Sequence, residues 1–228
     1  MWIARPPFAV LFAASLLGCV QSPPGPPLCA ADVACAAEGD VCVVGRCRPK
    51  KDTLVTAMDA RRLLLFPDAV AVVSSKGPSG GGGALPEAVS LGRSAAGDTS
   101  LLLHFEVPVA EVGEVSSAFL VLETATASEP PTQPVSLSIA RILEPWREDF
   151  VSWGRSPRLD LAEKAGLVGV TSPSPVRLDV THVVQRWAKR TGEEHGLAVL
   201  ADPDDPRGIT FSLGVVEKRG PRLEVYVR

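Results

Sequence analysis

Short apolar runs separated by clusters of turn-forming residues recur along most of the chain from about Thr53 onward. Such runs predict β-strands, and their even spacing is typical of a sandwich or barrel. The expected strands cover residues 69–73, 88–91, 100–107, 117–122, 135–143, 150–153, 175–179, 197–201, 209–213 and 223–227. Nine or ten strands of this kind predict an all-β fold of two packed antiparallel sheets. Residues 50–66 are ambiguous between a short helix and an extra edge strand.

One segment has a helical period instead of a strand period. Apolar residues recur at spacings of three and four between Asp179 and Gly192, at Val180, Val183, Val184, Trp187 and Ala188. This pattern predicts a single amphipathic helix, capped at its start by Asp179 or Thr181 and ended by Gly192. The side chains expected on its opposite, largely basic face are Gln185, Arg186, Lys189 and Arg190. That face either suits the helix macrodipole or contacts an anion, a polysaccharide or an envelope protein.

The first residues have the pattern of an export signal. One positive charge at Arg5 precedes an apolar stretch shorter than the roughly 20 residues that span a bilayer. The tetrad Leu16-Leu17-Gly18-Cys19 then resembles the lipobox of bacterial lipoproteins. The resemblance implies that the signal, residues 1–18, is removed and that Cys19 carries acyl chains such as palmitate. Ordinary secretion, with cleavage near Ala13-Ala14 or Gly18, is the alternative.

The lipobox resemblance also implies a location. Val20, rather than Asp, follows Cys19, which in lipoprotein sorting points to the outer membrane, at its periplasmic or its cell-surface face. The membrane is then a partner through the lipid anchor, because two or more acyl chains hold a protein there stably. Residues 19–28 combine this cysteine with a Pro-rich stretch that we expect to act as an extended spacer.

Four cysteines follow within nineteen residues, at Cys29, Cys35, Cys42 and Cys47. A small exported unit with little to bury compensates with disulfides, so residues 29–49 are predicted to form a module with two of them. Three pairings are open, and a four-cysteine zinc site is the alternative. The predicted sandwich domain then covers residues 50–228.

Composition narrows the possible partners. The chain has 228 residues, 46% of them hydrophobic and 21% charged, which supports a folded core. Its net charge is −3, so it has no basic field of the kind that binds a nucleic-acid backbone. The odd count of five cysteines is explained if Cys19 carries lipid and the other four form disulfides. No nucleic-acid partner is expected.

Several blocks arrive in the order of a known family. They are Ser100-Leu101-Leu102-Leu103-His104-Phe105, then Ile139 to Glu148 with Val151-Ser152-Trp153, then Leu178 to Trp187 followed by Gly196-Leu197. Over residues 66–228 the chain resembles the disaggregatase-related (DNRLRE) domain of bacteria and archaea, and the last block is also similar to transforming growth factor beta propeptides. His104 and His195 depart from the family pattern, which has Arg and Asn there.

The DNRLRE resemblance implies a jelly-roll-like β-sandwich with one crossing helix. Such domains are often attached to extracellular polysaccharide-acting or cell-surface proteins, and some are classed as carbohydrate-binding modules. The candidate ligand-binding residues are Trp146, Glu148 and Trp153, which combine aromatic rings with a carboxylate. Exposed, coplanar Trp146 and Trp153 would favour stacking on sugars, and burial of both would favour a scaffold.

The sequence contains few candidate catalytic or metal-binding residues. Glu144, Glu148 and Asp149 beside tryptophans suit either glycoside hydrolysis or the capping of strands. The match to G-x-S-x-G at residues 77–81 is a coincidence, because the glycines that follow make a poor helix start. The three histidines are far apart, so no metal site is predicted. Asp202, Asp204 and Asp205 are interpreted as a solvated acidic turn, with a calcium site as the alternative.

These observations predict a non-catalytic envelope lipoprotein whose β-sandwich binds carbohydrate or acts as a surface scaffold, with no catalytic residue and no cofactor. Two alternatives stay open. One is a polysaccharide-degrading enzyme, a hydrolase or lyase, that uses Glu144, Glu148 or Asp149. The other is a protein–protein interaction module that uses the sandwich edge or the basic helix face.

Overall fold

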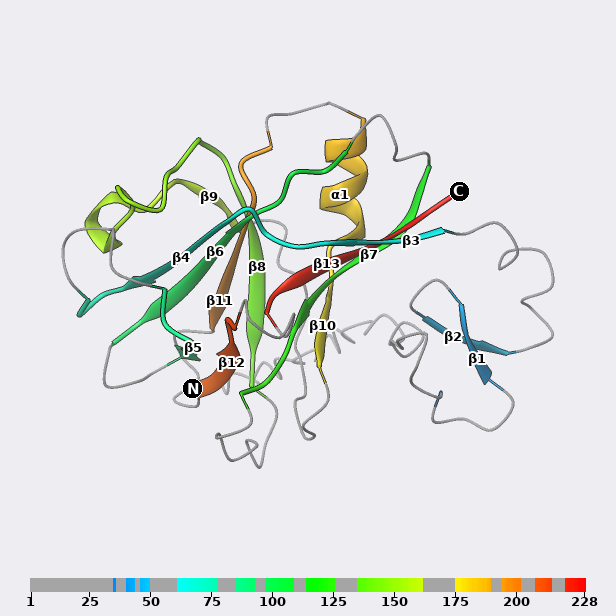
Figure 1. Cartoon of the computed structure of the whole chain (residues 1–228), viewed down its shortest axis with the longest axis horizontal. Coiled ribbons are helices and arrows are strands. Elements are labelled where there is room, and N and C mark those ends of the chain that lie inside the picture. The colour runs from blue at the N-terminus through cyan, green and yellow to red at the C-terminus, as the bar shows by residue number, and fades with distance from the viewer. Residues whose placement is uncertain are drawn as a thin grey trace, which may run out of the picture.

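The fold of the chain is all-β, with antiparallel sheets and one α-helix among the residues that the computed structural model describes (Figure 1). Those residues are 35, 40–43, 46–49, 61–77, 85–92, 97–108, 114–125, 135–161, 175–189, 194–201, 208–214 and 220–228. The predicted signal, Cys19 and the Pro-rich spacer lie outside them. In this described part, no helix is long and apolar enough to cross a membrane.

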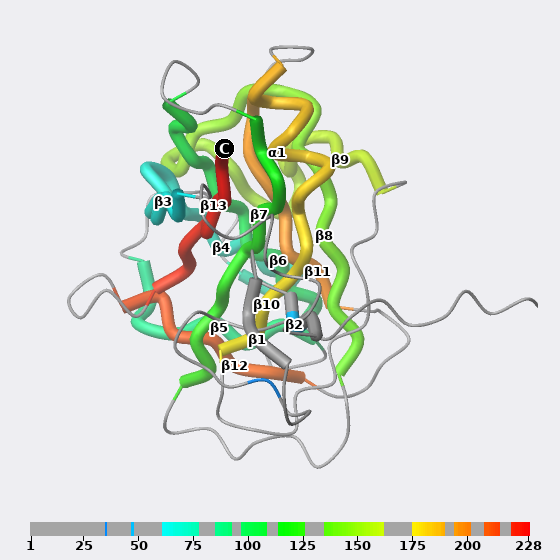
Figure 2. Tube along the Cα trace, turned by 90° about the vertical axis from the view of Figure 1, so that its right-hand side faces the viewer, coloured from blue at the N-terminus to red at the C-terminus, as the bar shows by residue number. Residues whose placement is uncertain are grey.

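Two antiparallel sheets make up the sandwich. The four-stranded sheet has the order β10 (Val176–Asp179), β7 (Val115–Leu122), β13 (Arg222–Val227) and β3 (Arg61–Leu65). The five-stranded sheet has the order β4 (Ala69–Ser74), β6 (Thr99–His104), β11 (Leu197–Ala201), β8 (Leu137–Ile142) and β9 (Leu159–Asp160). Figure 2 looks onto the four-stranded sheet from its outer side.

Two further ribbons complete the strands. β5 (Ala88–Gly92) pairs with β12 (Gly208–Ser212), and the ribbon continues the four-stranded sheet, because the Ser212 amide donates to the Glu123 carbonyl just beyond β7 at 2.8 Å. β1 (Asp40–Val43) and β2 (Arg46–Pro49) form a separate hairpin.

The winding of the strands is that of a jelly roll. From β3 to β13, with the β5–β12 ribbon left aside, the chain passes back and forth between the four- and five-stranded sheets, except at β4 and β6 and at β8 and β9, which are neighbours within the five-stranded sheet. Two sheets with this connectivity are a jelly-roll sandwich. The predicted fold class, an antiparallel β-sandwich with one helix, is confirmed.

The core lies between the inner faces of the two sheets. Because side chains alternate along a strand, Leu101 and Leu103 of β6 meet Leu120 and Leu122 of β7 there, all fully buried. Each such side chain contributes about 1.5–3 kcal/mol by leaving water. The alternation that predicted the strands is therefore the alternation that fills the core.

Helix α1 (Thr181–Ala188) adds its apolar face to that core. Val183, Val184 and Trp187 are buried with the sheet residues, as predicted. The Asp179 carboxylate accepts the Thr181 amide at 3.0 Å, although the residue at the N-cap position is Val180. Of the other predictions for this helix, Gly192 and Arg190 lie outside the described residues.

The placement of two other helix residues differs from expectation. The Thr181 hydroxyl does not cap the helix, because it accepts the Ala118 amide of β7 at 2.9 Å. Gln185 was expected on the outward face, but its amide nitrogen donates to the Val115 carbonyl at 2.9 Å. Both polar side chains satisfy backbone groups of β7, so they fix the helix against the four-stranded sheet.

The strand expected at residues 150–153 was wrong. The Phe150 and Val151 amides both donate to the Arg147 carbonyl, at 3.1 and 3.0 Å, and a short 3-10 helix, η2 (Trp153–Arg155), follows. Within this run only Val151 is buried against a sheet as an apolar side chain, while Phe150 and Trp153 are exposed. The ambiguity at residues 50–66 is resolved at its end by β3, an edge strand, while residues 50–60 lie outside the described part.

The cysteine module contains a disulfide between Cys35 and Cys47, whose Cα atoms are 5.7 Å apart. Of the three possible pairings, only the one that joins Cys29 to Cys42 then gives a second disulfide. Cys29 lies outside the described residues, so that second bond remains a prediction. The first bond supports the disulfide interpretation of the module.

Gly196 is a position where the fold requires glycine. Its φ is +96°, and a Cβ there would lie 2.1 Å from the Leu103 carbonyl oxygen. We expect Gly196→Ala to lower the free energy of unfolding by at least about 2 kcal/mol, through strain and displacement of β6. Urea unfolding measures this. Gly154→Ala is the matched control, because a Cβ on Gly154 meets nothing within 4 Å; equal stability of the two variants would contradict the prediction.

Candidate functional site

The loop of residues 143–158, between β8 and β9, covers the outer face of the five-stranded sheet. The outward side chains of that sheet include Ala71, Ala140 and Ala198, which are buried together with Val151 of the loop. Small residues at these positions let the loop backbone approach the sheet closely. The small outward residues of these strands therefore allow the loop to pack on the sheet. We call residues 143–158 the covering loop.

Two of the three candidate ligand-binding residues hold the covering loop in place. The Trp146 indole Nε1 donates to the His195 carbonyl at 2.8 Å, and the half-buried ring packs against the sheet. Glu148 Oε1 accepts the Val70 amide at 2.5 Å. Val70 belongs to β4, the edge strand, so this carboxylate satisfies a backbone group that the sheet leaves unpaired.

The other carboxylates of the loop are also engaged. Glu144 accepts the Arg158 amide at 2.9 Å and the Arg158 Nε at 3.0 Å, which closes the neck of the loop. The Arg158 backbone hydrogen bond, followed by that of its side chain, lowers the pKa of Glu144. Asp149 pairs with the Arg147 guanidinium through contacts of 2.7 and 3.1 Å.

An open pocket of about 510 Å³ lies on the covering loop. Phe150 stands at this pocket with 58% of its surface exposed, and the Arg147 guanidinium lies 4.7 Å from its ring centroid. Arg155 also lines the pocket. The lining residues are Glu144, Pro145, Trp146, Arg147, Phe150, Val151, Arg155 and Pro157.

The two tryptophans of the covering loop, Trp146 and Trp153, have different environments. Trp153, on η2, is 45% exposed and is not part of the pocket lining. Trp146 is half-buried and lines the pocket. The structure therefore brings Trp146, Glu148 and Trp153 onto one loop, but only Trp146 borders the pocket. Phe150 is the exposed aromatic residue that sequence reasoning missed, because its apolar run was assigned to a strand.

The geometry suits binding better than acid–base catalysis. A general acid in glycoside hydrolysis needs a raised pKa, whereas the pKa of Glu144 is lowered. Glu148 is bonded to a backbone amide, and Asp149 is bonded to an arginine. The pocket instead offers aromatic surface and cationic groups, which can pack on a ring and donate hydrogen bonds.

A histidine–carboxylate pair joins the last residue of β6, His104, to Asp68, the residue before β4. His104 Nδ1 is 2.8 Å from Asp68 Oδ1 and 3.0 Å from Oδ2. His104 is one of the two residues that depart from the DNRLRE pattern, and no sequence pattern links it to its partner 36 positions away. No group of three His, Cys, Asp or Glu side chains that could hold a metal occurs in the described ranges. Asp202, Asp204 and Asp205 lie outside those ranges.

No protein-family model matches the sequence, and a search of curated proteins finds no match. The resemblance to the DNRLRE domain stays a prediction from the sequence.

The Glu144–Arg158 contact predicts a pH dependence. Because the folded pKa of Glu144 lies below its ordinary value of 4.5, the contact stabilises the loop fully above that pH and is lost as the pH falls through the folded pKa. We expect the Arg158 amide proton, followed by NMR between pH 6 and pH 2, to titrate with a midpoint below 4.5. Glu144→Gln should abolish this titration, and Glu106→Gln, which removes an exposed carboxylate elsewhere, should retain it. A wild-type midpoint at or above 4.5 would contradict the assignment.

Proposed function

We propose that this protein is a non-catalytic lipoprotein of a bacterial envelope whose β-sandwich binds carbohydrate in the pocket of the covering loop. The observation that carries the proposal is the open pocket in which Phe150 is exposed beside Trp146. A volume of about 510 Å³ lies in the range of small-ligand sites. Sugar rings have apolar C–H faces that pack on aromatic rings, and their hydroxyls hydrogen-bond to charged groups such as Arg155.

The chain's N-terminal pattern supports the envelope part of the proposal. Residues 1–18 resemble a lipoprotein signal, and Cys19 follows directly at the position that such proteins acylate. The Pro-rich spacer that comes next would hold the folded part away from the lipid surface. The Cys35–Cys47 disulfide is consistent with an oxidising compartment outside the cytoplasm. Outer-membrane attachment is the location that we propose.

The carbohydrate part is supported by the DNRLRE resemblance and by the jelly-roll winding that this resemblance implies. A surface scaffold without a glycan ligand is the form of the proposal that remains if the pocket binds no sugar. The polysaccharide-degrading alternative has less support, because Glu144, Glu148 and Asp149 are each bonded to another group of the protein. No contact of the described residues favours the basic helix face as a docking site.

Loss of the exposed aromatic surface should weaken glycan binding. The chain beginning at Val20 is tested on an array of neutral and acidic glycans, and its ligand is then measured by calorimetry. We expect Phe150→Ala to weaken glycan binding about 10- to 100-fold. This is the loss of affinity that corresponds to removing the apolar surface of the ring from the interface. Trp153→Ala should weaken it less, because Trp153 does not line the pocket.

Phe66→Ala is the matched control for this experiment. Phe66 follows β3, a strand of the four-stranded sheet, and 45% of its surface is exposed. Its replacement by alanine should leave the affinity for the glycan unchanged. Absence of any glycan ligand would leave the scaffold form of the proposal. A glycan that binds Phe150→Ala and wild type equally would place its site away from the pocket.

Acylation of Cys19 is tested separately. Cells that express the full chain are grown with an alkyne-labelled palmitate, and the protein is recovered and scanned for label. Cys19→Ser should abolish labelling and release the protein from the membrane fraction, whereas Cys29→Ser, at the next cysteine, should remain labelled. Equal labelling of wild type and Cys19→Ser would show that this cysteine is not the acylated residue.

A further inference from the structure

Strand β3 is the last strand of the four-stranded sheet, and it carries exposed apolar side chains. Among the described strands its one neighbour is β13, so its other side is an edge of the sheet. Leu64 is 46% exposed, and Phe66, which follows the strand, is 45% exposed. Phe66 precedes Pro67, which favours the extended backbone that continues a strand. An apolar edge of this kind is a template on which a further strand can pair.

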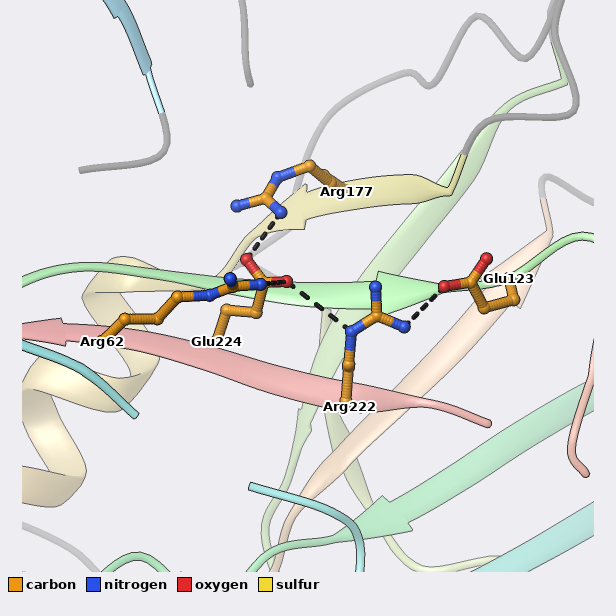
Figure 3. Close-up of polar contacts among 5 residues, drawn as sticks. All are labelled: Arg62, Glu123, Arg177, Arg222 and Glu224. Carbon is orange, nitrogen blue, oxygen red and sulfur yellow. Dashed lines mark hydrogen bonds and ion pairs between the residues drawn. The ribbon is translucent and has the colours of Figure 1, made fainter. Parts of the chain in front are cut away.

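A buried carboxylate neutralises the charge that β3 carries at Arg62 (Figure 3). Glu224 of β13 is fully buried, and it accepts Arg62 Nη2 on one oxygen and Arg177 Nη1 on the other, each at 2.6 Å. Natural edge strands commonly carry charged side chains that discourage pairing with another chain. Because Arg62 is held by a carboxylate of its own sheet, its charge does not protect the edge in this way.

Other arginines extend this network across the outer face of the sheet. Arg222 Nε lies 3.6 Å from Glu224, and Arg222 Nη1 donates to Glu123 at 2.6 Å. The Arg177 guanidinium lies 4.8 Å from the Phe119 ring centroid. Arginines of β3, β10 and β13 therefore meet around Glu224, and β3 is held to the sheet by side chains as well as by its backbone pairing with β13.

The hydrogen bonds of the sheet show which backbone groups of β3 point to its edge. The Ala118 carbonyl of β7 accepts the Val180 amide at 3.0 Å, so the backbone groups of Ala118 point toward β10, which ends just before Val180. Successive residues of a strand point to opposite sides, so Phe119 points to its partner in β13, Glu224. Glu224 in turn points back to β7. Its neighbour Leu64 is therefore in a non-hydrogen-bonded pair, and the Leu64 amide and carbonyl point to the edge.

An antiparallel copy of the same strand fits this edge. By the same alternation, residues 62, 64 and 66 all direct their backbone groups outward, so Leu64 can pair with Leu64 of a second copy, and Arg62 with its Phe66. On the outer face, leucine then meets leucine, and the Arg62 guanidinium lies on the Phe66 ring of the other copy. On the inner face, Leu63 meets Leu65 of the other copy, and both residues already pack against the core.

We propose that two copies of this chain associate through β3, antiparallel and centred on Leu64, so that their four-stranded sheets become one continuous sheet. The pairing forms about six backbone hydrogen bonds. It also covers the leucines and the phenylalanine that a single copy leaves exposed. A register centred on Leu63 would use the same backbone groups, but it would place Phe66 beyond the β3 strand of the other copy. The match of the strand with itself favours a second copy as the partner.

Dimerisation is tested by sedimentation velocity of the chain beginning at Val20, from low to high micromolar concentration. The wild type should shift from monomer to dimer as the concentration rises. Leu64→Lys should raise the dissociation constant of the dimer at least about tenfold, because it places like charges directly opposite each other. Leu161→Lys is the matched control and should dimerise as the wild type does, because Leu161 follows β9, in the other sheet, and is 53% exposed.

A wild type that stays monomeric throughout this range would overturn the proposal. A dimer that Leu64→Lys leaves unchanged would overturn it as well, since the interface would then lie elsewhere. Because Leu64 is exposed in the single copy, the folded state of the variant is checked by comparing its circular dichroism with that of the wild type.

Leu64→Cys tests the register of the two strands. Opposite residues of a hydrogen-bonded antiparallel pair have Cα atoms about 5.5 Å apart, a distance that a disulfide can span. Under oxidising conditions Leu64→Cys should therefore form a covalent dimer, whereas the wild type and Leu161→Cys should not. A Leu64→Cys variant that dimerises in the centrifuge without forming this crosslink would overturn the pairing centred on Leu64.

Discussion

Burial of the inner faces of the two sheets against each other is the interaction on which the other features depend. This packing determines which side chains of each strand point outward. In both sheets, some of the outward side chains are apolar. The five-stranded sheet turns Ala71, Ala140 and Ala198 outward, and the four-stranded sheet turns Phe119 and Val121 outward. A sandwich with two such outer faces needs a further layer on each side. The covering loop is one of these layers, and the arginines above Phe119 begin the other.

Most of the fold could be predicted from the sequence because strand alternation is a local signal. The strand at Leu197–Ala201 was predicted with the observed ends, and the helix face of Val183, Val184 and Trp187 followed from its period. The run at residues 150–153 failed for a physical reason. Val151 packs on the outside of a sheet while Phe150 and Trp153 are exposed at the surface, and these three apolar residues together have the composition of a strand.

Ligand binding by the candidate residues stays a prediction, and the contact of Glu148 with an edge strand agrees with the strand-capping interpretation of the loop's carboxylates. Trp146 and Glu148 both lie in the covering loop, where the Trp146 indole donates to a backbone carbonyl and Glu148 accepts a backbone amide of an edge strand. These partners, His195 and Val70, are brought near by topology and not by sequence. The pairing of Arg177 with Glu224, 47 positions apart, was missed because a charged residue at an alternate strand position predicts a solvated surface.

The position of β3 has a mechanical consequence. Under the proposed anchoring, a load between the membrane and a ligand held by the covering loop reaches the sandwich through residue Arg61, at the start of an edge strand with one neighbour, β13. Five residue pairs, from Arg61 with Val227 to Leu65 with Leu223, resist that load. The ion pair of Arg62 with Glu224 joins the same two strands near the loaded end. Under tension β3 is therefore the first element to peel, and the jelly roll yields from the strand that ties it to its stalk.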